Sequence, residues 1–183
     1  MSEPVNSFLP TEQRLAITCR RHPAFPREPA VLVRLVKHIY RRVHDDANAS
    51  LKHWGINHPE YNLLMMLYGT EGYTLNPSQL AEAAGEKAAN ITRLTNGLCD
   101  RGLIERTASQ EDRRKVALTL TKAGVAMIES FLPDVCSLLE RQSDGLQPRE
   151  MAQLEKLLKK FLDEVLLNPA IAMNDHHAGA VAR

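Results

Sequence analysis

The sequence has few cysteines, few aromatic residues and no long apolar run. Its three cysteines, Cys19, Cys99 and Cys136, are widely spaced and form no CxxC pair. A disulfide framework is therefore not expected, and a reducing compartment is the simplest setting. Residues 1–9 contain neither the basic nor the apolar region of a signal peptide. No apolar run approaches the length of about 18 residues that a membrane-spanning helix needs. These absences predict a cytoplasmic protein with no membrane partner.

Motifs of catalysis are also absent. The sequence contains no GxSxG, Walker A, GxGxxG or HExxH motif, so neither an enzyme nor a bound cofactor is expected. Four of the seven histidines, His38, His44, His53 and His58, lie fairly close together. They form no HxxxH pair and no His/Cys cluster with the spacing of metal ligands. Metal sensing is therefore a weak alternative, and no metal site is predicted.

What is present is an ordinary, helix-favouring composition. Hydrophobic residues make up 44% of the chain and charged residues 25%, which is enough to build a core without metal or disulfide support. The length of 183 residues suits one domain, or one domain with appended dimerisation helices. The formal net charge of +1 neither favours nor excludes nucleic acid, so the placement of the charges has to decide.

The first part of the chain changes character after a proline-rich arm. Residues 1–27 contain four prolines and are interpreted as an irregular arm with a short helix around 11–18. From Pro29 to about His53, apolar residues recur at helical spacing, which predicts one long amphipathic helix. Gly55 is expected to end it.

A second helix is expected directly afterwards. The run Asn57-His58-Pro59-Glu60 has the pattern of a helix start, with an Asn cap, an early Pro and a Glu three residues after the cap. The segment that follows, to about Tyr68, is apolar on most of its faces. Because such a helix is usually buried, we expect it at the centre of the domain.

The middle of the chain has the pattern of a helix-turn-helix followed by a β-hairpin. Asn76-Pro77-Ser78-Gln79 repeats the helix-start signal, and it predicts a short helix over 77–84. A glycine separates this helix from a second one over about 86–100. Residues 103–107 and 116–121 alternate in polarity around a charged segment, which indicates two strands and a long hairpin tip. Together these elements predict a winged helix.

Two further helices are expected after the hairpin. The first carries an apolar stripe from Val125 to Leu139 and is expected to kink at Pro133. The second, from Pro148 to Leu166, carries a wide, nearly heptad stripe that needs a partner surface. We assign this stripe to a dimer interface that it shares with the long first helix.

The predicted fold is thus mainly α with a small β-hairpin wing, combining a winged helix-turn-helix with a helical dimerisation domain. The expected parts are an N-terminal arm (1–27), the dimerisation domain (28–55 and 122–167), the winged helix-turn-helix (56–121) and a flexible tail (168–183).

The second helix of the helix-turn-helix has one apolar side and one polar side. Ile91, Leu94 and Leu98 are expected to pack inwards. The residues on the other side are small, polar or basic. A recognition helix in the major groove needs this mixture, because Asn can pair with adenine and Arg with guanine or phosphate. The alternative is a merely solvated face. The candidate DNA-binding residues of this helix are Lys87, Ala88, Asn90, Thr92, Arg93 and Asn96.

The hairpin tip carries three adjacent cations, Arg113, Arg114 and Lys115, behind Glu111 and Asp112. At a protruding tip such a cluster suits contact with phosphates and the minor groove. A solvated charge run is the alternative. Between residues 86 and 115 there are seven Lys or Arg against five Asp or Glu, so binding should depend on placement rather than on bulk charge.

These segments resemble the wing signature of the MarR family of bacterial regulators. The resemblance rests on Gly102-Leu103-Ile104-Glu105-Arg106, on Asp112-Arg113-Arg114, and on the run from Leu118 to Gly124. Further positions resemble the multidrug-efflux repressors of the EmrR/MprA type, namely Arg34, His38, Gly55-Ile56-Asn57, Asn90 and Thr92-Arg93.

The resemblance implies a homodimer whose winged lobes enter the major grooves of a palindromic operator in double-stranded DNA. It also implies that Arg114 reaches the minor groove and that Asp112 braces the wing arginines. Many relatives are repressors that small aromatic acids or phenols release. The matching ligand site here would use Arg34 or His38 against a carboxylate, with Tyr61, Met65 and Tyr68 as its wall. The alternative is that Tyr61 and Met65 belong to the core and that His38 is an interface histidine.

Two alternative functions remain within the same fold. Cys19 is adjacent to Arg20, Arg21 and His22, and nearby cations lower the pKa of a thiol, so the chain could be a redox-sensing regulator. The winged helix could also serve as a protein-interaction module. Salt separates the second alternative from DNA binding, since binding to DNA weakens steeply as the salt concentration rises.

Overall fold

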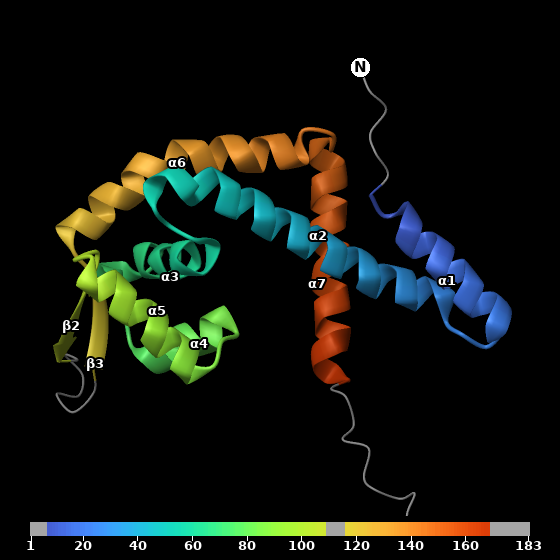
Figure 1. The fold of residues 1–183 in the computed structure, drawn as a ribbon, viewed down its shortest axis with the longest axis horizontal. Coiled ribbons are helices and arrows are strands. Elements are labelled where there is room, and N and C mark those ends of the chain that lie inside the picture. Colours follow the sequence, from blue (N-terminus) through green and yellow to red (C-terminus); the bar gives the residue numbers. More distant parts are fainter. Residues whose placement is uncertain (1–6, 109–115, 169–183) are drawn as a thin grey trace, which may run out of the picture. The chain divides into compact units, whose positions relative to one another are not determined.

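The computed structural model describes residues 7–108 and 116–168, which form mainly helices and a small antiparallel sheet (Figure 1). The helices are α1 (Leu9–Arg21), α2 (Arg27–Leu51), α3 (His58–Tyr68), α4 (Pro77–Ala84), α5 (Ala88–Asp100), α6 (Lys122–Ser143) and α7 (Pro148–Leu167), with 3-10 helices η1 (Lys52–Trp54) and η2 (Glu71–Tyr73); the strands are β1 (Thr74–Leu75), β2 (Ile104–Ala108) and β3 (Val116–Leu120). The chain forms two compact units, Met1–Leu138 and Leu139–Arg183. Within the described ranges, no helix is both long and apolar enough to cross a membrane.

The helix-turn-helix lies where the sequence predicts it. Helices α3 and α4 both begin with a complete capping box, in which Asn57 Oδ1 accepts a hydrogen bond from the Glu60 N–H (2.9 Å) and Asn76 Oδ1 accepts one from the Gln79 N–H (2.9 Å). Helix α4 has the predicted bounds and ends at Gly85, whose φ of 62° is a left-handed conformation that glycine adopts without strain. The next helix, α5, begins two residues later than predicted.

The N-terminal arm is more regular than predicted. The helix expected around 11–18 extends over Leu9–Arg21, and α2 already begins at Arg27. Pro10 lies in the first turn of α1, where its missing N–H removes no helical hydrogen bond. Helix α1 packs against α2, and its Leu15 is 1% exposed. This contact between two helices stabilises α1, and local sequence patterns do not reveal it.

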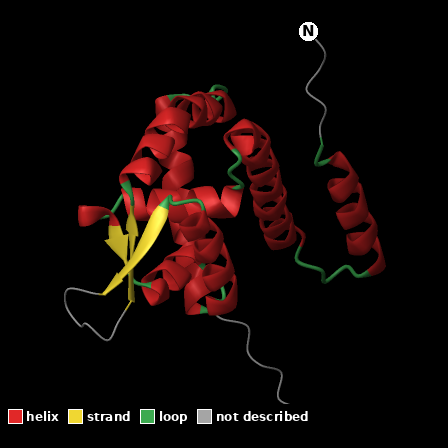
Figure 2. Ribbon diagram, turned by 60° about the vertical axis from the view of Figure 1, so that its left-hand side comes forward, coloured by secondary structure: helices red, strands yellow, loops and turns green. Residues whose placement is uncertain are grey.

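The wing is part of a three-stranded sheet with the order β1-β3-β2 (Figure 2). The predicted hairpin is present, with β2 and β3 paired from Ile104↔Leu120 to Ala108↔Val116. The short strand β1 was not predicted, because two residues are too few for an alternating pattern. It pairs Thr74 with Thr119, and the two hydroxyl oxygens of this pair are 2.8 Å apart.

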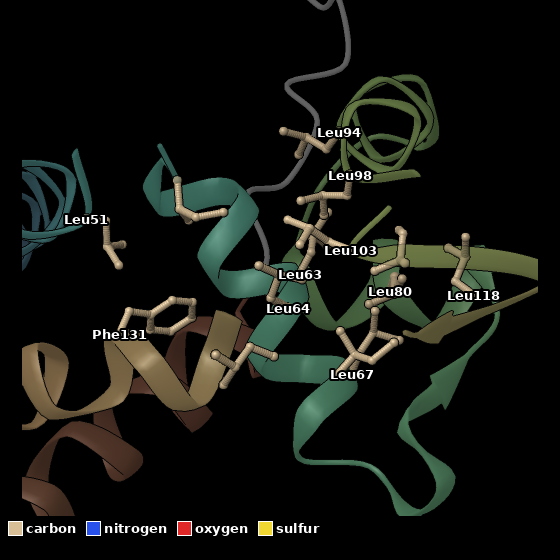
Figure 3. Close-up of a cluster of buried hydrophobic side chains, with 14 of the residues drawn as sticks. Leu51, Leu63, Leu64, Leu67, Leu80, Leu94, Leu98, Leu103, Leu118 and Phe131 are labelled. Carbon is tan, nitrogen blue, oxygen red and sulfur yellow. The ribbon is translucent and has the colours of Figure 1, made fainter. Parts of the chain in front are cut away.

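Helix α3 lies at the centre of the hydrophobic core, as its apolar sequence predicts. Leu63, Leu64 and Leu67 of α3 are at most 1% exposed. Figure 3 shows that side chains from α4, α5, β3 and α6 converge on them, including Leu80, Leu98, Leu118 and Phe131. The core therefore fixes α4 and α5 on one side of α3 and leaves their outer faces free.

Helix α6 is a single helix from Lys122 to Ser143, and Pro133 lies inside it without interrupting it. In the second unit, α7 begins with a capping box in which the Glu150 carboxylate accepts a hydrogen bond from the Gln147 N–H (2.8 Å). None of the twenty residues of α7 is buried. Its stripe leucines, which include Leu154 and Leu158, are 44–68% exposed.

Candidate nucleic-acid interface

Helix α5 has the two faces that the sequence predicts. Its buried residues are Ile91, Leu94, Thr95 and Leu98. Of the six candidate DNA-binding residues, Asn90 is half-buried and the others are exposed. The apolar face therefore packs on the core while the polar face remains exposed. This polar face consists of Lys87, Ala88, Asn90, Thr92, Arg93 and Asn96.

The candidate base-reading side chains are hydrogen-bonded to one another. The Asn90 Nδ2 amino group donates to Glu86 Oε2 (2.8 Å), and Arg93 Nη2 donates to Asn90 Oδ1 (2.8 Å). Each polar atom of the Asn90 amide thus has one protein partner. Adenine would contact the same two atoms, through their remaining N–H donor and lone pair or in place of these hydrogen bonds.

A residue that the sequence analysis did not select, Arg106, connects the wing to α5. Its Nη2 atom donates to Asn96 Oδ1 (2.5 Å) and lies 3.2 Å from Thr95 Oγ1. Thr95 is 2% exposed. The alternation of the strand places Arg106 on the same face as the buried Ile104, which was a usable signal. Its partner in α5, however, lies ten residues earlier and could not be identified from a local pattern.

The predicted wing tip lies outside the described residues. This applies to Arg113, Arg114 and Lys115, and also to Asp112, which was predicted to brace them. The structure does place the strands that carry this segment, since β2 ends at Ala108 and β3 begins at Val116.

The residues predicted to bind an aromatic ligand lie in separate environments. His38 Nε2 is 2.9 Å from Ser7 Oγ, and the imidazole ring lies edge-on to Phe8 (5.7 Å between ring centroids). Arg34 is exposed on the same helix, α2. Tyr61 contacts the ring of Phe131 (5.8 Å). His38 and Tyr61 therefore face different partners.

The other two predicted ligand residues lie on α3. Met65 packs against the hydrophobic core. Tyr68 stacks on Tyr73, with 5.7 Å between the ring centroids. Both residues are half-buried, so each already has protein neighbours.

A pair of histidines joins α2 to α3. The rings of His44 and His58 lie 5.0 Å apart, and the Asn48 side chain holds both residues. Asn48 Oδ1 accepts a hydrogen bond from the His58 N–H (2.9 Å), and Asn48 Nδ2 donates to the His44 carbonyl oxygen (2.9 Å). Burial, and secondly the charge of His44, lower the pKa of His58. The pKa of the nearby Tyr61 phenol is raised, mainly by burial and secondly by the charge of Cys136.

The three cysteines are free thiols on three different helices. Cys19 is half-buried on α1, Cys99 is half-buried on α5, and Cys136 is exposed on α6. Over residues 7–108 and 116–168, no three or more His, Cys, Asp or Glu side chains are grouped so that they could hold a metal ion.

Comparison with known proteins identifies relatives that match most of the chain. Residues 54–115 match the model of the MarR family. The chain is 34% identical over 160 residues to the transcriptional repressor MprA of Escherichia coli (strain K12), over 87% of this chain and 91% of the relative. It is also 34% identical over 142 residues to the HTH-type transcriptional regulator PrsX of Escherichia coli, over 78% and 86% of the two chains. A crystal structure of a mutant MarR from E. coli complexed with operator DNA has a TM-score of 0.67 and 26% identity, over 74% of this chain and 96% of that chain.

Proposed function

The chain belongs to the MarR family, and we propose that it is a cytoplasmic repressor that binds a palindromic operator as a homodimer and is released by a small aromatic acid or phenol. The relatives named above are regulators of transcription and not enzymes. The observation that carries the proposal is the exposed polar face of α5, which is held on a buried apolar face beside the hairpin. That is the arrangement by which a winged helix presents a recognition helix to DNA.

DNA recognition is assigned to two surfaces of the same lobe. The polar face of α5 would enter the major groove, with Asn90 and Arg93 reading base edges and the small residue Ala88 permitting close approach. The wing tip would contact the flanking minor groove through Arg113, Arg114 and Lys115, with Asp112 bracing them. A DNA-bound structure within the family supports this use of the fold.

Dimerisation is assigned to two exposed apolar stripes, one on α2 and one on α7. On α2, Leu32, Val36 and Ile39 are 40–52% exposed. On α7, Leu158 and Leu162 are 47% and 55% exposed. Isolated exposed apolar residues are common on monomers, but a continuous stripe along a helix is typical of a surface that another molecule covers. We propose a second copy of the chain as that molecule, since two copies would align two winged lobes with two half-sites.

The binding site for the aromatic acid or phenol is assigned to α2 and α3. The ligand would contact Tyr61, Met65 and Tyr68 of α3, with Arg34 or His38 of α2 neutralising its charge. The half-buried phenol of Tyr61 beside Phe131 supports an aromatic contact at this position. His38 Nε2 contacts Ser7, just before α1, so a ligand that binds this nitrogen would replace Ser7.

The proposal is tested by fluorescence anisotropy with a duplex that the protein selects from a random-sequence library. Titrations are run at two salt concentrations, with and without salicylate, against a random duplex of equal length as the control. Selective binding that weakens with salt and with salicylate is the expected result. Selective binding that salicylate leaves unchanged would contradict the aromatic effector, and a titration with an oxidant would then test Cys19. Failure to enrich any sequence would contradict the proposed function as a whole.

A further inference from the structure

The contact between Arg106 of β2 and Asn96 of α5 links the wing strand to the exposed face of the recognition helix. One guanidinium nitrogen reaches Asn96 Oδ1 at 2.5 Å and Thr95 Oγ1 at 3.2 Å. Thr95 is almost fully buried, and its hydroxyl donates to the Thr92 carbonyl oxygen (3.2 Å). A single guanidinium nitrogen therefore joins a buried hydroxyl to an exposed amide.

The sheet determines the direction of the Arg106 side chain. Arg106 is paired with Leu118 of β3, which is 0% exposed. Alternate residues of a strand share a face, so Arg106 lies on the same face as the buried Ile104. From this face the Arg106 side chain reaches Thr95 and Asn96 of α5. The register of the hairpin thus determines the face on which the Arg106 side chain lies, and its contacts with α5 hold the guanidinium there.

The chemistry of the pair determines which atom of the Asn96 amide remains available. A guanidinium has only donors, so the amide atom that faces it has to be the carbonyl oxygen. The Nδ2 amino group of Asn96, with its two N–H donors, is then left for another partner. An amide fixed in this way directs its oxygen at Arg106 and keeps both N–H donors for an acceptor such as guanine O6 or N7 or thymine O4. An amide that is free to turn could instead offer the donor and acceptor pair that adenine requires.

We propose that Arg106 is a positioning residue that fixes the Asn96 amide as a hydrogen-bond donor and so sets the base preference at one position of the operator. This inference rests on the proposed function. Arg106 acts through Asn96, and the base is read by Asn96. The contact joins two elements that are distant in sequence, so the same residue also ties the wing strand to the recognition helix.

The experiment compares variants on the operator selected by the wild-type protein and on all its single base-pair changes. Arg106→Met retains the aliphatic stem of the side chain, which covers the sheet face, and removes every donor. We expect it to reduce discrimination at one base pair by about 10-fold, since one good base contact is equivalent to about 1–3 kcal/mol. Asn96→Ala should reduce discrimination at that same base pair. The double variant should lose no more than either single variant, because both changes remove one coupled contact.

Three further measurements separate positioning from other roles. Arg106→Lys restores a positively charged donor group and should recover part of the discrimination. Arg101→Ala removes the same charge from a residue paired with Glu60 and should leave the discrimination unchanged. The dependence of log affinity on log salt should be equal in the wild type and in Arg106→Met. Thermal unfolding of each variant without DNA shows whether it is folded.

The opposite results overturn the inference. A salt dependence that falls by about one charge in Arg106→Met would identify Arg106 as a phosphate contact instead. Losses at different base pairs, or losses that add in the double variant, would show that Arg106 does not act through Asn96. Failure of the wild type to enrich any sequence would overturn the proposed function itself, whereas a selective wild type with an equally selective Arg106→Met would overturn only this inference.

Discussion

The winged lobe, residues 56–108 and 116–121, and helix α7 contain the same kind of apolar residue in opposite surroundings. In the lobe, Leu64, Leu67 and Leu118 are 0% exposed, whereas Leu158 and Leu162 of α7 are 47% and 55% exposed. The lobe buries its leucines because short helices and a hairpin close around α3 within one chain. A single helix cannot cover its own stripe. Apolar periodicity thus predicts which face is buried, and the fold around it decides whether the covering surface comes from the same chain.

The largest predicted difference between the winged lobe and α7 is the loss of stability when a leucine is truncated. Leu64→Ala should lower the free energy of unfolding by about 2–5 kcal/mol, because it removes buried methyl groups and leaves a cavity in the core. Leu167→Ala, at a residue that is 76% exposed at the end of α7, should change it by less than about 0.5 kcal/mol. Urea denaturation measures both. Similar losses in the two variants would contradict the difference in burial.

The second prediction concerns the stripe of α7. Leu158→Asp should raise the dissociation constant of the dimer by at least about 100-fold, because an unpaired charge in an interface costs about 3–5 kcal/mol. Gln153→Asp introduces the same charge beside the stripe and serves as the control. Light scattering coupled to gel filtration measures the mass. A dimeric Leu158→Asp protein would show that the stripe is covered by something other than a second copy.

The third prediction concerns the outer face of the lobe. Asn90→Ala should reduce the preference for one base pair by about 10-fold, since a bidentate contact provides about 1–3 kcal/mol of discrimination. Affinity for random DNA should change little, and the oligomeric state should not change. Anisotropy titrations with the selected operator and its single base-pair variants measure the effect. An equal loss on every sequence would indicate that Asn90 contacts a phosphate instead.

The smallest predicted effect is a pH dependence at the first residue of α3. The pKa of His58 is lowered from its ordinary value of 6.5 by burial and then by His44. As the pH falls below that value, the unfolded chain binds the proton first, so the folded state loses stability over the range between the ordinary and the lowered pKa. The urea midpoint should be lower at about pH 5.5 than at about pH 7.5, and His58→Gln should show a smaller difference. An equal difference in both proteins would assign the pH dependence to other groups.

The parts of the fold that depend on local sequence could be predicted. The capping boxes at Asn57 and Asn76 identified the starts of α3 and α4, and Gly85 identified the end of α4. The alternation of residues 116–121 identified β3. Each of these signals lies within a few residues of the structure that it determines.

The parts that depend on contacts between distant segments could not be predicted. Strand β1 exists because Thr74 and Leu75 pair with β3, more than forty residues later. The length of α1 follows from its packing against α2. The contact of Arg106 with Asn96 joins a strand to a helix. For the proposed ligand, the local pattern selected His38 and Tyr61, but only the structure shows that they face different neighbours.

The most direct test of the central claim is hydroxyl-radical footprinting on the selected operator. Two winged lobes that are held together by a dimer should protect two half-sites related by a dyad, with centres about one helical turn, or 34 Å, apart. Protection should extend into the minor groove on the outer side of each half-site, where the wings would lie. Leu158→Asp should weaken both halves together. A single protected half-site, or protection without a dyad, would contradict the account.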